Sequence, residues 1–186
     1  LQNGDVITEV NGIMIDVLGL SASISLDDFQ FRTGDGNDPD SWLPAPLPIA
    51  ITVRAGAGAG GSDRIELVWG ESAVKNAWLQ VTLEGNDAWG GFNLGTGLPA
   101  SDVFYFGSRI GDTGSGTDVA AVTSAADELA ARFNLGVNQE ITSLYDFDRN
   151  GVVSAGDQLI ARFNAGVLTM IDLPGPQGMP LAASAV

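Results

Sequence analysis

Between Asp5 and Gly107 the apolar residues come in six short runs, separated by clusters of Gly, Pro, Asp and Asn. The runs are rich in β-branched and aromatic residues and cover residues 5–15, 23–31, 49–55, 64–69, 77–83 and 102–106. In the fourth run, Ile65, Leu67 and Trp69 fall on one face of a strand. Short strands with no amphipathic helix between them predict a mostly β fold, an antiparallel β-sandwich.

After residue 111 the pattern changes to two Ala-rich segments with helical spacing, residues 124–136 and 154–166. They form a repeat, since Asp, Arg, Phe and Asn recur 30 residues apart (157 − 127 = 30). In each copy a Leu and a Phe lie four residues apart, on one face of a helix. We therefore predict two short helices in a small α module, with Phe133 and Phe163 packed against each other in its core.

The change of pattern divides the chain into three parts. We predict a β-sandwich domain over residues 1–111, a small α module over residues 112–172, and a flexible tail or linker over residues 173–186, where Pro and Gly are frequent. A length of 186 residues and 19.2 kDa fits one medium domain that carries a small module.

Charge and composition exclude several classes of function. Eight basic residues against 23 acidic ones give a net charge of −15 and a pI near 4.1. This field repels phosphate backbones and anionic membranes, so we expect no nucleic-acid binding and no membrane insertion, and cations are favoured ligands. With no His and no Cys, the chain lacks the usual nucleophile pairs and His/Cys zinc sites.

The segment from Asp112 to Ser115 has the Asp-Thr-Gly-Ser sequence of aspartic proteases. That chemistry needs two carboxylates that share one proton, and the chain holds a single copy of the motif. A second copy could come only from a homodimer, and we expect a monomer. We therefore predict that the chain is not an enzyme.

The strongest motif runs from Asp146 to Asp157, with the sequence DFDRNGVVSAGD. Calcium is bound by six to eight oxygen atoms, which an EF-hand loop supplies from positions 1, 3, 5, 7 and 12, with Gly at position 6. Gly151 stands at position 6 here. The sequence therefore predicts a Ca²⁺ site whose ligands are Asp146, Asp148, Asn150, the backbone carbonyl of Val152, and Asp157.

The first repeat fits the calcium pattern less well, and two registers are open. Counted back from Asp127, position 3 falls on Asp118 and position 7 on Val122. In the second register Asp112 opens a longer loop, 15 residues before Asp127 (127 − 112 = 15), where the second repeat has 11 (157 − 146 = 11). We predict calcium ligands at Asp112, Asp118, Asp127 and the Val122 carbonyl. A metal-free turn is the alternative.

A calcium loop followed only by its exiting helix, and duplicated about 30 residues apart, resembles the type I dockerin repeat. The segment before residue 146 is too short for an entering helix, and position 12 is Asp where EF-hands have Glu. The resemblance covers roughly residues 48–166, including the β-rich part. It implies a paired F-hand module in a piece of a longer, secreted modular protein, docking to a cohesin-type or other cell-surface protein.

In dockerins the partner face lies near loop positions 10, 11, 17 and 18. The resemblance therefore implies contacts at Ala155, Gly156 and Arg162, with Ala125, Ala126 and Arg132 as the symmetric set. Phe163 and Phe133 hold position 18, and we favour the module core for both. The two arginines are the preferred contact residues, and they should be largely redundant.

The competing hypothesis is a carbohydrate-binding module, because dockerins commonly accompany polysaccharide-degrading glycoside hydrolases. Trp42 and Trp89 lie in loops rich in Gly, Asp and Pro, where an exposed indole could stack on a sugar ring. Anchoring these loops to the β-sandwich is the alternative role. Trp69 and Trp78 lie in predicted strands, and we place both in the core.

Overall fold

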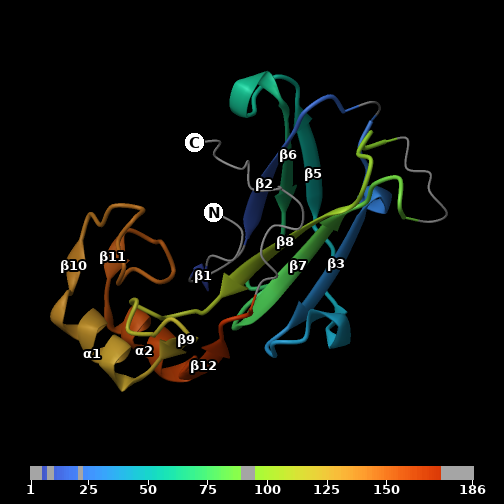
Figure 1. Ribbon diagram of the computed structural model, residues 1–186. Coiled ribbons are helices and arrows are strands. Elements are labelled where there is room, and N and C mark those ends of the chain that lie inside the picture. The colour runs from blue at the N-terminus through green and yellow to red at the C-terminus, as the bar shows by residue number, and fades with distance from the viewer. Residues whose placement is uncertain (1–5, 8–10, 21–22, 89–94, 173–186) are drawn as a thin grey trace, which may run out of the picture.

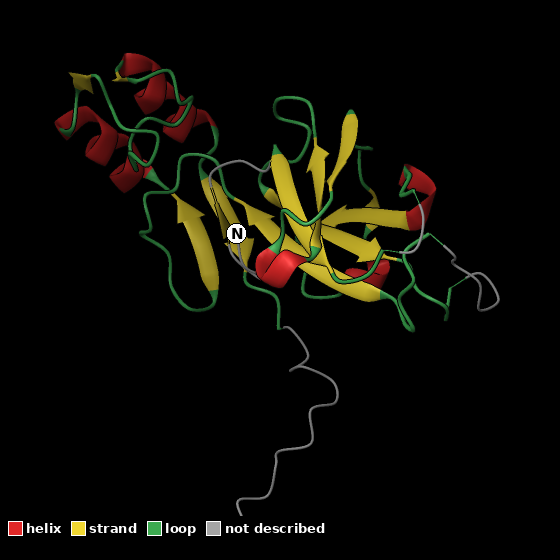
Figure 2. Ribbon diagram, turned by 90° about the horizontal axis from the view of Figure 1, so that it is seen from above, coloured by secondary structure: helices red, strands yellow, loops and turns green. Residues whose placement is uncertain are grey.

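The computed structural model describes residues 6–7, 11–20, 23–88 and 95–172 (Figure 1). Trp89, one of the two loop tryptophans singled out above, lies outside the described residues. The fold is mostly β, with strands in antiparallel sheets and two α-helices. Figure 2 shows the helix pair at one end of the molecule, beside the sheets. Within the described residues, no helix has the length and apolar character needed to cross a membrane.

The larger sheet has five strands, in the order β1-β8-β7-β3-β4. The bounds are β1 Val6–Ile7, β8 Asp102–Ser108, β7 Ala77–Leu83, β3 Phe29–Gly34 and β4 Leu43–Pro44. Neighbouring strands are antiparallel except β1 and β8, which are parallel. The central pairing is long, since all of β7 pairs with β8, from Ala77 opposite Ser108 to Leu83 opposite Asp102.

The smaller sheet has three antiparallel strands, in the order β2-β6-β5. They are β2 Gly12–Val17, β6 Asp63–Val68 and β5 Ala50–Arg54. The six runs predicted as strands thus overlap β2, β3, β5, β6, β7 and β8, and the structure extends β2, β3, β6 and β8 beyond the predicted bounds. Single turns of 3-10 helix lie between strands at Leu26–Asp28, Pro39–Ser41 and Ala59–Gly61.

Both sheets contribute to one hydrophobic core. The smaller sheet supplies Ile13, Ile15, Val17, Ile65 and Leu67, and the larger sheet supplies Phe29, Phe31, Leu79, Val81, Leu83 and Phe106. Trp69 packs edge-on against Phe31, with ring centroids 5.6 Å apart, so its predicted place in the core is confirmed. Each fully buried side chain of this size contributes about 1.5–3 kcal/mol, and this core fixes how the two sheets lie against each other.

The two predicted helices are present as α1, Ala125–Phe133, and α2, Ala155–Phe163. Each begins with a capping box in which a serine and the aspartate three residues later bond each other's backbone N–H groups. Both helices end on an Asn cap, at Asn134 and Asn164. Two short ribbons flank them: β9 Ala120–Thr123 with β12 Gly166–Thr169, and β10 Gly136–Val137 with β11 Val152–Val153.

The prediction that Phe133 and Phe163 form the core of the helix pair is wrong. Their exposed fractions are 77% and 79%, and the fully buried positions between the helices are Ala131 and Ala161. The capping aspartates set this rotation, because they must point toward their loops. Each helical residue turns by about 100°, so a Phe six positions beyond its Asp points about 120° away from it around the helix axis.

The helix-bearing part, residues 112–172, packs directly on the larger sheet. Trp42 and Trp78 form one buried cluster with Ala121 of β9 and Leu168 of β12. Trp78 is therefore buried as predicted, on the face opposite the main core. The Trp42 indole is also buried, and its Nε1 donates to the Gly36 carbonyl at 3.0 Å. Trp42 thus has the anchoring role, and its ring is not displayed for a sugar.

Candidate metal centre

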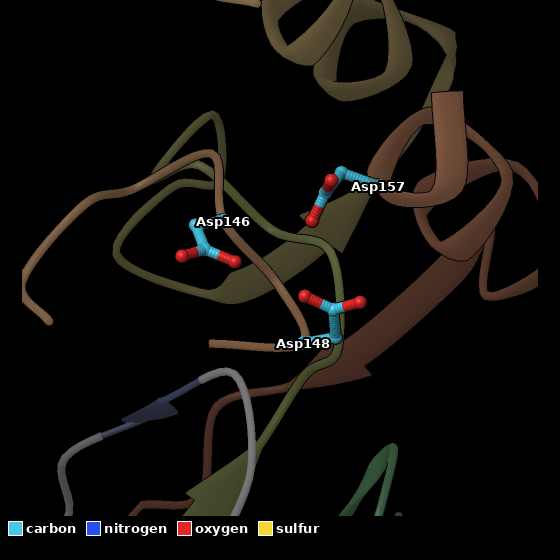
Figure 3. Close-up of side chains that lie close together, drawn as sticks. All are labelled: Asp146, Asp148 and Asp157. Carbon is cyan, nitrogen blue, oxygen red and sulfur yellow. The ribbon is translucent and has the colours of Figure 1, made fainter. Parts of the chain in front are cut away.

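Three carboxylates of the second loop converge in the structure. Asp146, Asp148 and Asp157 each offer one oxygen within 4.8 Å of the others. Figure 3 shows the three side chains close together. Asp146 and Asp157 are buried, and Asp148 is exposed at the mouth of the cluster. The sequence spacing predicted this convergence. Among the described residues these three form the one acidic cluster of this kind.

Asp157 is held by the start of α2. Its Oδ2 accepts hydrogen bonds from the Ser154 backbone N–H at 2.8 Å and the Ser154 hydroxyl at 3.3 Å, and its Oδ1 accepts the Phe147 N–H at 2.8 Å. The capping box and the first turn of the loop therefore share one carboxylate. This arrangement fixes Asp157 toward the loop before any ligand is considered.

Asp146 organises the backbone turn. Its Oδ1 accepts the Asn150 N–H at 3.1 Å and its Oδ2 accepts the Gly151 N–H at 2.9 Å. Gly151 has φ +84°, a left-handed conformation that glycine adopts without strain. The Asn150 side chain lies in the same turn, where it donates to Asp148 Oδ2 at 2.8 Å and accepts the Val152 N–H at 2.8 Å. Val152 then opens β11.

Electrostatics make this cluster a candidate cation site. Partial burial raises the pKa of Asp148 above its ordinary value, and the nearby charges of Asp157 and Asp146 raise it further. At an effective dielectric constant of 20, two like charges 4 Å apart repel by about 4 kcal/mol. A divalent cation would convert that repulsion into attraction. Because the three carboxylates offer only oxygen ligands, the site suits a hard cation.

The equivalent carboxylate of the first loop, Asp127, is satisfied by protein groups. Its Oδ1 accepts the Thr113 N–H at 3.0 Å and the Thr113 hydroxyl at 2.7 Å. Its Oδ2 accepts the Ser124 N–H at 2.7 Å and the Ser124 hydroxyl at 3.0 Å. Burial opposes ionisation of Asp127, but hydrogen bonds from Thr113 and Ser124 outweigh it and hold the pKa below its ordinary value.

These contacts align the two loops. The Thr113 N–H meets Asp127 as the Phe147 N–H meets Asp157, so Asp112 corresponds to Asp146 and the longer register is the structural one. The predicted carboxylate ligands of the first loop, Asp112, Asp118 and Asp127, do not form such a cluster. Asp118 is exposed on a turn closed by two hydrogen bonds between Thr117 and Ala120, and the Val122 carbonyl lies 3.3 Å from the Ser115 hydroxyl.

Three residues near the first loop were missed by sequence reasoning: Thr113, Ser115 and Arg109. Thr113 follows Asp112 directly and Ser115 lies three residues after it. Two hydroxyl residues this close to an acidic residue were the available signal in the sequence. Arg109 is buried, and its guanidinium donates to the Asn164 carbonyl at the end of α2. Burial lowers the Arg109 pKa, while the charges of Asp112 and Asp127 oppose that shift. No sequence pattern predicted this contact with α2.

The two helices expose matching side chains, which we call the paired face: Leu129, Arg132, Phe133, Leu159, Arg162 and Phe163. The predicted contact positions Ala125, Ala126, Ala155 and Gly156 are exposed as well, in the first turns of the same helices. The ion pairs of the two arginines are not symmetric. Arg162 forms a two-pronged ion pair with Glu128, whereas the residue that corresponds to Glu128 in the second repeat is the uncharged Gln158.

No protein-family model, no curated protein and no solved structure matches this chain.

Proposed function

We propose that the chain is a non-catalytic attachment fragment, in which an antiparallel β-sandwich carries a dockerin-like, calcium-binding helix pair. The two sheets with one shared core support the first part of this proposal. The second part is supported by two capped helices, each following a loop whose last acidic residue is buried and belongs to the capping box of the helix. The parent would be a secreted, modular protein, and calcium would be the resident ion of the second loop.

The exposed paired face carries the proposal of attachment. Phe133 and Phe163 keep 77% and 79% of their surface in contact with solvent, although the helices bury smaller alanines. On each helix an exposed Leu, Leu129 or Leu159, lies four residues before the Phe and therefore on the same face, and exposed apolar patches of this kind mark interaction sites. A protein partner with an apolar groove, such as a cohesin-type or other cell-surface domain, would bury both rings.

Calcium would act on attachment through α2. Asp157 belongs both to the acidic cluster and to the capping box of α2, so an ion at this cluster would tie the loop to the helix that carries Arg162 and Phe163. Ligand binding to the folded form stabilises it by RT ln(1 + [L]/Kd), about 2.7 kcal/mol at a hundredfold excess over Kd. Binding of the partner should therefore require calcium.

Surface plasmon resonance against a panel of cohesin-type domains tests attachment, with calcium and then with EDTA. We expect binding only with calcium, and its loss in the double variant Phe133→Ser, Phe163→Ser. A matched control is Leu43→Ser with Leu47→Ser, two exposed apolar residues outside the helix pair, which should bind as the parent does. Calcium-independent binding, or equal loss in both double variants, would refute the proposal.

Carbohydrate binding is the second candidate, and Trp42 does not favour it because its ring is buried. The remaining candidate, Trp89, lies outside the described residues. Glycan-array binding that is lost on changing Trp89→Ala would establish this function. We prefer attachment because the apolar residues of the paired face are exposed in both repeats.

A further inference from the structure

We propose that the first loop is closed by protein hydroxyl groups in the place of an ion, so that each chain takes up one calcium and only α2 depends on it. This inference rests on the proposed calcium site of the second loop and specifies how that site regulates the paired face. It departs from the symmetric, two-ion arrangement that the repeat alone suggests.

The Ser115 hydroxyl occupies the position that an ion would take. Its oxygen lies 3.1 and 3.2 Å from the two carboxylate oxygens of Asp127, and 3.3 Å from the Val122 carbonyl. These are the groups predicted to serve as loop positions 12 and 7. One hydroxyl therefore contacts the carboxylate and the carbonyl that would otherwise face a metal ion. In the aligned second loop the corresponding residue is Arg149, whose guanidinium points to the Ser143 carbonyl.

Asp127 also has no acceptor capacity left for an ion. A carboxylate offers about four lone-pair sites. Five donors surround it within 3.2 Å: the N–H and hydroxyl of Thr113, the N–H and hydroxyl of Ser124, and the hydroxyl of Ser115. An ion would have to displace these bonds from a buried group. Asp157, by comparison, receives three bonds from Phe147 and Ser154.

The other acidic residues of the first loop face elsewhere. Asp112 Oδ1 accepts the N–H groups of Gly114 at 2.8 Å and Ser115 at 3.2 Å, so it closes its own turn. Asp112 and Asp118 line a shallow cavity of about 310 Å³ whose wall does not include Asp127. The buried guanidinium of Arg109 supplies resident positive charge near Asp112 and Asp127. The first loop thus has its counter-charge built in.

The two halves of the paired face should differ in their dependence on calcium. The half on α1 should be formed with or without calcium, because hydroxyls cap and close its loop. The half on α2 should be ordered by the ion, because Asp146, Asp148 and Asp157 repel one another without it. Binding of one calcium ion would therefore order the α2 half of the paired face, next to an α1 half that is already ordered.

Isothermal titration of the calcium-stripped full chain with CaCl₂ counts the ions. We expect one ion per chain, and the same count in Asp112→Asn and Asp118→Asn. Two ions per chain, reduced to one by Asp127→Asn, would overturn this inference and leave the proposed attachment function standing. No uptake at all would remove the calcium site of the proposed function, and this inference with it.

Hydrogen–deuterium exchange of the same protein locates the effect. Calcium should raise protection of residues 155–163 and leave residues 125–133 unchanged. Ser115→Ala should lower protection of residues 125–133 about tenfold, with or without calcium, because the hydroxyl that links Asp127 to the Val122 carbonyl is lost. Ser143→Ala is the matched control in the second repeat, where the hydroxyl donates to Gln139, and it should leave residues 125–133 unchanged. Equal calcium-induced protection of both helices would overturn the inference.

Discussion

The indole Nε1 of Trp78, in the middle of the larger sheet, donates a hydrogen bond to the carbonyl oxygen of Thr169 at 2.8 Å, across 91 residues of chain. Asn76, two residues earlier, donates to the Asn164 side chain at 2.8 Å. The Arg109 guanidinium bonds the Asn164 carbonyl as well. Three residues in or beside the larger sheet thus form hydrogen bonds with the end of α2 and with β12, the strand that follows it. The unfolding of β12 and of the end of α2 should therefore be coupled to that of the larger sheet.

Changing Trp78→Phe tests this coupling. The substitution removes the indole donor from the Thr169 carbonyl, which should lower the unfolding free energy by about 1–3 kcal/mol. It also leaves a cavity in the buried cluster with Trp42 and Leu168. We expect faster amide exchange in β12 and an unfolding free energy lower by at least that amount. Denaturant unfolding followed by far-UV circular dichroism, with amide exchange read by mass spectrometry, measures both quantities.

The matched control is Trp69→Phe. Its indole also donates to a carbonyl, that of Pro46 at 2.9 Å, but within the part of the chain that forms the two sheets. This variant should lose comparable stability without selectively loosening β12. If Trp78→Phe leaves β12 exchange at the parent rate, the helix pair is an independent unit.

The exposure of Phe133 and Phe163 predicts a second result. Each ring is mostly in solvent, so Phe133→Ser and Phe163→Ser should change the unfolding free energy by no more than about 0.5 kcal/mol. Ala161→Leu should cost about 1–3 kcal/mol, because the methyl group of Ala161 is fully buried and the chain at Gly111 passes next to it. Chemical denaturation of the three variants compares them. A larger loss from either serine variant would place the rings in the core.

The sequence predicted the strands and helices well for a local reason. Buried residues such as Ile65 and Leu67 alternate with less buried ones, and this pattern can be recognised within a few residues. The same holds for the Ser and Asp of the capping boxes of α1 and α2. The acidic cluster of the second loop was readable too, because its spacing follows a known ligand pattern. The prediction of buried Phe133 failed because helix rotation depends on where the cap must point, which hydrophobic spacing does not encode.

The contacts within the first loop could not be predicted from the sequence. Two registers were open, and the choice between them depended on which backbone N–H reached Asp127. The contacts of the Ser115 hydroxyl with Asp127 and with the Val122 carbonyl become visible only when the loop is folded. In the same way, Arg109 and Trp78 gave no sequence signal of their contacts with Asn164 and Thr169, because those contacts join distant parts of the chain.

Calcium should stabilise the protein through Asp146. With calcium at a hundredfold excess over Kd, the gain should be about 2.7 kcal/mol, seen as a rise in Tm that EDTA reverses. Asp146→Asn keeps the side-chain volume but removes a buried negative charge from the cluster, so most of the rise should disappear. Asp112→Asn changes the equivalent residue of the first loop and should keep the full response. Differential scanning calorimetry measures all three proteins, and equal responses would contradict the assignment.

The ion pair between Asp16 and Arg64 predicts a result at acid pH. Hydrogen bonds from Arg64, with a further one from the Ala59 N–H, lower the pKa of Asp16 from its ordinary 3.8 to about 2. A carboxyl with a depressed pKa stabilises the fold fully above 3.8 and loses that contribution as the pH falls through about 2. Carbon-13 NMR of the Asp16 carboxyl should show the lowered midpoint. Arg64→Gln should move it up toward the ordinary value, and Arg54→Gln, which breaks the ion pair with Glu66, should not.

Replacing the Ser115 hydroxyl by a carboxylate should give the first loop an ion site. In Ser115→Asp a second negative charge would lie beside Asp127, whose two oxygens are now 3.1 and 3.2 Å from the hydroxyl. Without calcium the two like charges should repel, and the variant should be less stable than the parent. With calcium the new pair, together with the Val122 carbonyl, offers oxygen ligands of the kind the ion prefers. Titration calorimetry should then count two ions per chain, against one for Ser115→Asn, which has the same size and no charge. A count of one in both variants, with equal loss of stability, would show that the hydroxyl does not stand at an ion position.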